Sequence, residues 1–449
     1  MPQALRHTLL SIRDLAITAG PFVLLALVLL VLAYVILQPN PPKKVVLATG
    51  AEQGAYAEFG KRYAAQLREH GIEVVLRATQ GAAENLQLLR DPDSGVDLAF
   101  VQGGADVEHA SAADAEAANA GLESLGSLFH EPLWLFYREE AAQQKLGKPA
   151  LAMLPELKGW TLNIGSPGSG VPNLMRRLLD ANHLEPGALT LTEKPSTPAV
   201  VALLEGEIDA LAFASAPEAP LVQLLLQTPG IRLMDFPQAE AYTRRFPFLS
   251  NVVLPRGVVD LAADRPPAPI RLVAPTATLV AREGVHPALI QLFVQAARSI
   301  HGGPGWFQRK GSFPSVENTE RALAPEAERF YRNGPPLLQR YLPFWLANLI
   351  DRMWVVLVSI IAILIPLSRI VPPLYQFRVR SRIFRWYGQL RRVEESIGEK
   401  SGAELLEQLD DIEQRAGRVT VPLSYADELY SLRSHIGMVR RRVREAAGA

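Results

Sequence analysis

The feature that most constrains this chain is an uncharged apolar run from Ala19 to Leu37, close to the amino terminus. Its nineteen residues would rise about 28 Å as a helix, close to the roughly 30 Å hydrocarbon core of a bilayer. A cleaved signal peptide is the alternative, but the run is too long for one and no small-x-small cleavage motif follows it. We therefore expect a transmembrane helix over residues 19–38.

A second apolar segment runs from Met353 to Leu367 and lies between Arg352 and Arg369. Arginines at both ends of a span can extend toward the two membrane surfaces. The alternative is a helix buried in a protein core, but such a helix normally has a polar face, and this segment has none. We expect a second transmembrane helix over residues 352–370.

Basic residues set the expected orientation of the two spans. Seven arginines lie between residues 369 and 392, before the first acidic residue, Glu394. The positive-inside rule places this end of the chain in the cytoplasm. Residues 1–18 and 375–449 are then both cytoplasmic, and the domain at 44–345 lies on the periplasmic, extracytoplasmic side of the cytoplasmic (inner) membrane.

The cytoplasmic tail at 375–449 has apolar residues at helical spacing, which predicts three short amphipathic helices. Its first part also mixes arginines with aromatic residues, as RNA-binding segments do. Beside a membrane, contact with anionic lipid is the favoured role, so we expect the lipid bilayer and no nucleic acid as a partner. A stabilising helical bundle and a signalling role both remain open for this tail.

The extracytoplasmic part alternates short apolar strands with amphipathic helices, which indicates an α/β domain built from parallel βαβ units. The pattern runs once through residues 44–102 and restarts near Gly159, so we expect two similar lobes with a ligand crevice between them. Lobe 1 covers about 44–135 and 250–345, and lobe 2 about 140–245. The predicted strands are 44–49, 73–79, 97–102, 160–164, 189–192, 208–213 and 272–280.

Two glycine-rich turns, at 49–54 and 165–170, each join a predicted strand to a helix. Glycine lets the backbone approach a ligand, and free N–H groups at a helix start attract an anion. The alternative is that these glycines only make tight βα turns. The candidate ligand-binding residues here are Thr49, Gly50, Gln53, Gly54 and Tyr56 in the first half, and Ser166, Gly168, Ser169 and Gly170 in the second.

Further polar residues lie at or just after strand ends in the first half, where they are placed to orient a small ligand. These are Thr79, Gly81, Asn85 and Gln102. Glu131 is a candidate for binding an amine group. Each of these residues is alternatively an ordinary cap, turn or crossover residue.

The composition and the motifs exclude several classes of site. There is no cysteine, so a disulfide, a thiolate metal site and a cysteine nucleophile are all excluded. The eight histidines include no i, i+4 pair, and neither glycine turn matches a P-loop, a dinucleotide-binding fingerprint or a nucleophile elbow. We expect no catalytic residues, no metal and no cofactor, and hence a binding protein rather than an enzyme.

Motifs over residues 44–395 resemble the TAXI solute-binding proteins, the receptor subunits of one class of TRAP transporters, and in particular their membrane-tethered branch. The motifs are Ala48–Tyr56, Thr79–Asn85, Asp97–Gln102, Gly165–Gly170, Arg245–Leu249, Ala274–Leu279, Ile300–Gly305, Gly334–Trp345 and Ser381–Gly388. The resemblance implies a type II periplasmic-binding-protein fold, capture of a small carboxylate such as an amino acid or dicarboxylate, and transfer of this organic anion to membrane permease subunits.

The chain departs from this family at two places. Ala82 and Ala83 stand where the family often has Ser-Val, and Val171 stands where it often has Thr. Two hydroxyl contacts to a ligand are therefore missing. Two functions remain open, namely a tethered receptor for a TRAP-type secondary transporter and a membrane-anchored sensor that relays lobe closure to the cytoplasmic helices.

Overall fold

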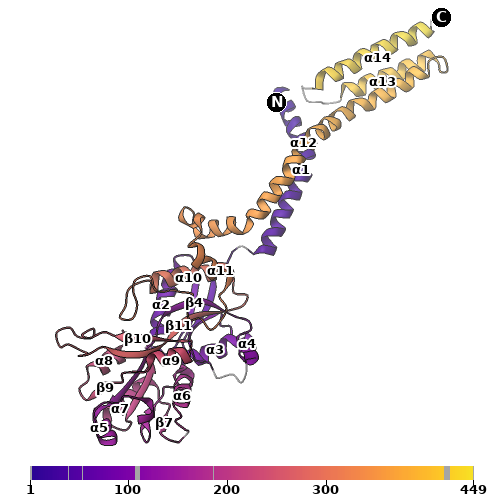
Figure 1. Cartoon of the computed structure of the whole chain (residues 1–449). Helices are drawn as coiled ribbons and strands as arrows, with labels where there is room; N and C mark the ends of the chain where they lie inside the picture. Colours follow the sequence, from indigo (N-terminus) through magenta and orange to yellow (C-terminus); the bar gives the residue numbers. More distant parts are fainter. Residues whose placement is uncertain are drawn as a thin grey trace. The chain divides into compact units, whose positions relative to one another are not determined.

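A computed structural model describes residues 3–38, 40–52, 54–106, 112–185, 187–418 and 425–447, so the candidate residue Gln53 lies outside the described residues. The chain divides into two compact units (Figure 1). One is Asn40–Asn348, and the other combines Met1–Pro39 with Leu349–Ala449. Each unit has a hydrophobic core made from its own residues.

The first sheet of the Asn40–Asn348 unit has six strands in the order β10-β11-β3-β1-β2, with β4 also paired to β11. β1 is parallel to β2 and β3, and β11 is antiparallel to β3 and β4. The strands are β1 (Lys44–Ala48), β2 (Glu73–Arg77), β3 (Leu98–Gln102), β4 (Leu122–His130), β10 (Leu249–Leu254) and β11 (Ile270–Arg282). The accompanying helices are α2 (Ala55–Arg68), α3 (Ala82–Arg90), α4 (Ala112–Asn119), α10 (Pro287–His301) and α11 (Pro325–Asn333).

The second sheet has five strands in the order β7-β6-β8-β5-β9. Its strands are β5 (Leu133–Arg138), β6 (Thr161–Asn163), β7 (Thr190–Thr192), β8 (Ala210–Ala214) and β9 (Ile231–Leu233). Its helices are α5 (Glu139–Leu146), α6 (Val171–Ala181), α7 (Ser196–Glu205), α8 (Pro220–Gln227) and α9 (Ala239–Arg245). Short 3-10 turns occur at η1 (Pro92–Ser94), η2 (Leu154–Leu157), η3 (Pro167–Ser169) and η4 (Leu337–Arg340).

The two sheets repeat one topology, as the restart of the sequence pattern predicts. In each, a parallel trio (β2-β1-β3 or β7-β6-β8) is extended by one antiparallel strand, β11 or β5. Both extending strands link the lobes. β4 of the first sheet runs through Glu131 and Pro132 directly into β5 of the second.

β11 belongs to both cores. Its first half, with Leu272 and Val273, packs in the second core, and its second half, with Leu279 and Val280, packs in the first. Leu249 and the rest of the buried face of β10 also belong to the second core. We expected the chain to return to lobe 1 near residue 250. The change of core instead occurs inside β11, because β10 pairs with the half of β11 that covers the second lobe.

The other unit is helical, and two of its helices are candidate membrane spans by length and composition. α1 (Gln3–Leu37) contains the apolar stretch Ala16–Leu37, and α12 (Phe344–Glu395) contains Leu346–Glu395. No residue of the most apolar window of either helix is buried. This exposure is inconsistent with the alternative that the second segment is a core helix.

α12 continues well beyond the predicted span. It passes through Pro366, Pro372 and Pro373 without ending, which the neighbouring backbone of a long helix tolerates at the loss of single hydrogen bonds. The first of the three predicted tail helices is therefore the end of α12, and the other two are α13 (Gly402–Gly417) and α14 (Ala426–Ala447). Figure 1 shows all three, and they share a core that includes Ile383, Leu409 and Ile436.

Candidate functional site

The two lobes touch where the second glycine turn meets the start of α3. A Cβ atom on Gly81 would lie 2.9 Å from Cα of Ser169, and one on Gly168 would lie 2.5 Å from Cβ of Gln80. A Cβ on Gly170 would also be only 2.8 Å from its nearest neighbour. Side chains at these positions would force the lobes apart, so glycine is required here for close backbone contact between the lobes.

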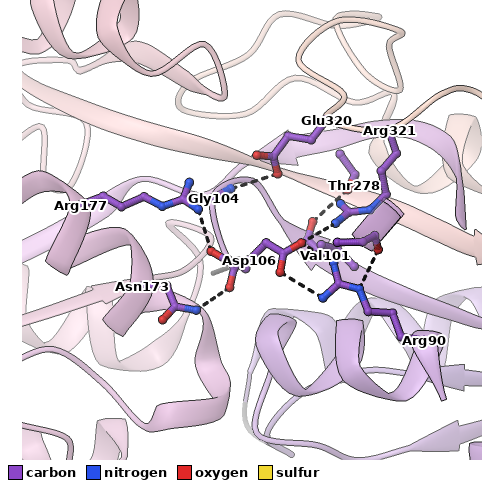
Figure 2. A network of polar contacts seen from close by, with 11 residues as sticks. Arg90, Val101, Gly104, Asp106, Asn173, Arg177, Thr278, Glu320 and Arg321 are labelled. Atoms are coloured by element: carbon purple, nitrogen blue, oxygen red, sulfur yellow. Dashed lines mark hydrogen bonds and ion pairs between the residues drawn. The ribbon is translucent and has the colours of Figure 1, made fainter. Parts of the chain in front are cut away.

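A polar network around Asp106 lies beside this contact (Figure 2). The Arg90 guanidinium holds both carboxylate oxygens of Asp106, with Nη1 at 3.0 Å from Oδ1. Arg321, whose side chain is only 3% exposed, lies with Nη2 3.4 Å from Oδ2 of the same carboxylate. A carboxylate between two guanidinium groups offsets the cost of burying three charges.

The second lobe joins this network through α6. Asn173 Nδ2 donates to the carbonyl of Ala105 at 2.8 Å, and Arg177 Nη2 donates to the carbonyl of Asp106 at 2.9 Å. Glu320 accepts a hydrogen bond from the amide of Gly104 at 3.1 Å. The loop after β3 is therefore held by side chains from both lobes, as Figure 2 shows.

A second group of buried polar side chains lies where the chain crosses between the lobes. Tyr56 donates its hydroxyl hydrogen to Oε2 of Glu131 at 2.6 Å, and both residues are buried. Burial raises the pKa of Glu131 to about 7, although the hydrogen bond from Tyr56 acts in the opposite direction. Burial also raises the pKa of Tyr56, so this hydroxyl stays protonated near neutral pH.

Gln102 completes this group, which we call the hinge cluster (Tyr56, Gln102 and Glu131). Gln102 shares a face of β3 with Phe100, whose ring stacks on Tyr56 at 5.1 Å between centroids. Within the described part of the chain, Gln102 Nε2 is buried without a hydrogen-bond partner. Thr276 Oγ1 is also buried without one, but Thr276 precedes the residue opposite Gln102, so its side chain points to the other face of the sheet.

An unpaired buried polar group of this kind costs roughly 1–3 kcal/mol, and a ligand is one way to supply the missing partner. The sequence predicted all three residues of the hinge cluster as candidates.

Three other predicted residues have their polar atoms paired inside the first lobe. Asn85, which is fully buried, donates from Nδ2 to the carbonyls of Thr49 at 2.5 Å and Phe100 at 2.8 Å. Its Oδ1 accepts the hydroxyl of Thr79 at 2.8 Å, and the Thr49 hydroxyl donates to the Arg77 carbonyl at 3.2 Å. These side chains hold the ends of β1, β2 and β3 together, so their role at the site is structural.

The second glycine turn lies at the contact between the lobes. Its residues Gly168 and Ser169 pack against residues 80–84 of lobe 1. The Ser169 hydroxyl donates to the Ser166 carbonyl in the same turn at 2.7 Å. The absence of side chains at Gly81, Gly168 and Gly170 lets the backbones of the two lobes meet directly.

A cavity of about 320 Å³ does lie between the lobes, at the start of α2. Gly54 and Ala55 line it from lobe 1, residues 216–220 line it from lobe 2, and residues 303–308 close a further side. Gly50 of the same glycine turn, by contrast, is buried and does not line the cavity. No three His, Asp or Glu side chains gather as a metal site among the described residues.

Comparison with known proteins now bears on this geometry. The family model described as "NMT1-like family" matches residues 47–302, more than half of the chain and parts of both lobes. Among curated proteins, none matches the chain significantly. The family match and the two sheets together give an α/β fold of the periplasmic-binding-protein kind.

Three solved structures are distantly similar. The alkanesulfonate-binding protein SsuA from Xanthomonas axonopodis pv. citri, bound to MOPS, has 15% identity, with 58% of this chain and 75% of that one covered and a TM-score of 0.36. The aliphatic sulphonate binding protein SsuA from Escherichia coli has 15% identity, 72% and 83% coverage and a TM-score of 0.35. The CcmR regulatory domain from Synechocystis PCC6803, in complex with 2-PG, has 12% identity, 58% and 98% coverage and a TM-score of 0.36.

Replacing Asn85 by alanine is expected to lower the free energy of unfolding by about 3 kcal/mol, because two carbonyls and one hydroxyl lose their partner in a buried place. Urea titration of the protein in nanodiscs, followed by tryptophan fluorescence, measures the change. Asn251→Ala, at an exposed position of β10, is the control and should stay within about 0.5 kcal/mol of wild type. Equal effects of the two changes would contradict the structural role of Asn85.

The Glu131 pKa predicts a pH dependence of stability. Because folding raises this pKa from 4.5 to about 7, the stabilisation from the protonated group is fully present below about pH 4.5 and is lost as the pH rises to about 7. The loss amounts to about 3 kcal/mol. Between pH 4.5 and pH 8, we expect the free energy of unfolding of wild type to fall by about 3 kcal/mol more than that of Glu131→Gln. Glu140→Gln, on the surface of α5, should behave like wild type, and a flat difference curve for Glu131→Gln would refute the assignment.

Proposed function

The chain belongs to the NMT1-like family, and from this premise we propose that it is a membrane-anchored solute-binding protein that captures a small organic anion between its lobes. The observation that carries the proposal is the hinge cluster, where the buried Nε2 of Gln102 has no hydrogen-bond partner among the described residues. A ligand that supplies this partner lies beside Glu131, where β4 runs into β5 and the chain crosses between the lobes. Binding would therefore favour the closed arrangement.

One feature favours a carboxylate, and a second favours an ammonium group, as an amino acid carries. The first turn of α2 lines the cavity, and its N-cap residue Gly54 provides no side-chain cap. Free amides at a helix start attract a carboxylate. Glu131, with a pKa of about 7, can carry the negative charge that an ammonium group needs.

We further propose binding rather than catalysis. The candidate nucleophile Ser169 donates its hydroxyl within its own turn at 2.7 Å, and no step of covalent chemistry is needed to bind a ligand at the hinge cluster. Trapping a solute by closure of two lobes requires only hydrogen-bond donors and acceptors that replace water.

We place the lobed unit outside the cytoplasmic membrane, anchored by α1 and α12, with both termini in the cytoplasm. The apolar stretches of these helices and the arginines after the second one support this placement. From the resemblance to TAXI proteins, we propose that the captured solute passes to the permease subunits of a TRAP-type secondary transporter.

Ligand-induced stabilisation tests this function. We expect one class among amino acids, dicarboxylates and 2-oxo acids to raise the melting temperature of the full chain in nanodiscs, because a ligand at 100 times its Kd stabilises by about 2.7 kcal/mol. Gln102→Ala should reduce the shift, whereas Gln144→Ala, on the exposed face of α5, should not. A folded protein that responds to no anion in the panel would exclude the proposal.

A sensor is the second candidate function, and one observation favours it. α12 is a single helix that contains both the second span and the residues, such as Ile383 and Leu390, that build the core shared with α13 and α14. A continuous helix can transmit a rotation or displacement from the span to the tail without an intervening loop.

Removing residues 396–449 distinguishes the two functions. A transport receptor without α13 and α14 should keep its ligand affinity and support uptake by its permease at the wild-type rate. The second arm uses the full-length chain with a spin label at Tyr430→Cys, an exposed position of α14; for a sensor, ligand should change the EPR spectrum of this label. The label is unambiguous because the chain has no cysteine, and a spectrum unchanged by saturating ligand would exclude the relay.

A further inference from the structure

The contact between α6 and the loop after β3 is polar, unlike the two cores that it joins. Each lobe packs largely around a hydrophobic core of its own. The contact between them is made of glycine backbone, main-chain carbonyls and the side chains of Asn173 and Arg177. Interfaces inside one chain allow relative motion unless they are large and hydrophobic. This contact can therefore open while both lobes stay folded.

Two side chains of α6 bind the backbone of the other lobe. Asn173 Nδ2 donates to the carbonyl of Ala105 at 2.8 Å, and Arg177 Nη2 donates to the carbonyl of Asp106 at 2.9 Å. Asn173 and Arg177 are four residues apart, so they lie on the same face of the helix. Figure 2 shows both reaching the loop after β3. The second lobe thus holds two consecutive carbonyls of the first.

The Arg177 guanidinium is positioned by its own lobe. It lies 5.6 Å from the centroid of the Phe248 ring, and Phe248 belongs to the second core. A guanidinium over an aromatic face is held by a cation–π attraction, and its planar group loses little freedom when it forms a hydrogen bond. The donor therefore needs little rearrangement to bind the loop.

The loop that α6 binds is held in place by the first lobe. Arg90 Nη1 lies 3.0 Å from Oδ1 of Asp106, and Arg321 Nη2 lies 3.4 Å from Oδ2 of the same carboxylate. Glu320 accepts a hydrogen bond from the amide of Gly104 at 3.1 Å. Bonds with an ionised partner are stronger than neutral ones. The first lobe therefore fixes the carbonyls of residues 105 and 106 where α6 can reach them.

The glycines beside these bonds leave no room for a solute within the contact. A Cβ atom on Gly168 would lie 2.5 Å from Cβ of Gln80, and one on Gly170 would lie 2.8 Å from Cβ of Ala105. Ala105 is also the residue whose carbonyl accepts the bond from Asn173. Because the two lobes are in van der Waals contact here, protein atoms alone make this part of the closed arrangement.

We propose that Asn173 and Arg177, bonded to the carbonyls of Ala105 and Asp106, form an interlobe latch that keeps the lobes closed before any solute binds. The latch sets the ratio of closed to open lobes in the free protein, because no solute atom takes part in it. A solute can enter between the lobes only when both side chains release the loop, so uptake depends on the open fraction. The latch goes beyond the proposed function, since it is a property of the chain alone.

Double electron–electron resonance on the full chain in nanodiscs, without solute, tests the latch. Spin labels at Arg68→Cys, at the end of α2 in lobe 1, and at Glu205→Cys, at the end of α7 in lobe 2, report the separation of the lobes. Both positions are exposed, and the chain has no other cysteine. We expect the doubly labelled protein to show mainly the closed separation that the structure has.

Adding Asn173→Ala and Arg177→Met removes both bonds and keeps an apolar side chain against the Phe248 ring. The ratio of closed to open molecules should then fall at least about tenfold, because one neutral and one charge-assisted hydrogen bond are lost. Arg176→Met is the matched control. It changes the neighbouring residue of α6, whose guanidinium pairs with Glu193 in the same lobe, and it should leave the distances unchanged.

Gly168→Ala provides a second, independent variant in case the first one does not fold. Its Cβ would press on Gln80 across the contact, so the labels should move apart although no latch bond has been removed.

A longer separation in either variant supports the latch. The inference is overturned if the labelled protein without solute lacks the closed separation, or if both variants reproduce its distance distribution. These measurements use no solute, so their failure would leave the solute-binding proposal intact. Equally, a panel of solutes that does not bind would leave the latch intact.

Discussion

The backbone contact between Gly81 and the second glycine turn is the constraint on which the rest of the lobed unit depends. It brings the lobes so close that a Cβ at Gly81 would lie 2.9 Å from Ser169. This approach allows Arg177 of α6 to reach the carbonyl of Asp106. With the lobes held in this way, the hinge cluster is kept from water, which makes each of its hydrogen bonds stronger than in solvent.

Local sequence signals predicted the elements whose hydrophobic spacing and turn residues lie within their own segment. α6 (Val171–Ala181) follows the glycine-rich turn at 165–170, where a helix was predicted, because Pro172 suits a first turn and the apolar residues recur at helical spacing. β4 was missed, since Ser124 and Ser127 interrupt its apolar pattern. The use of Asn85 within lobe 1, and the pairing of β11, depend on residues far apart in sequence, which no local pattern reveals.

β11 also sets the order in which the chain can become a finished domain. Its contacts with β3 join residues far apart in sequence, such as Val101 and Thr278, which are 177 positions apart. One side of β3 therefore stays unpaired until the whole second lobe and β11 have left the ribosome. An open strand edge of this kind can pair with other chains, so the unfinished chain is most prone to aggregation before β11 completes the sheet.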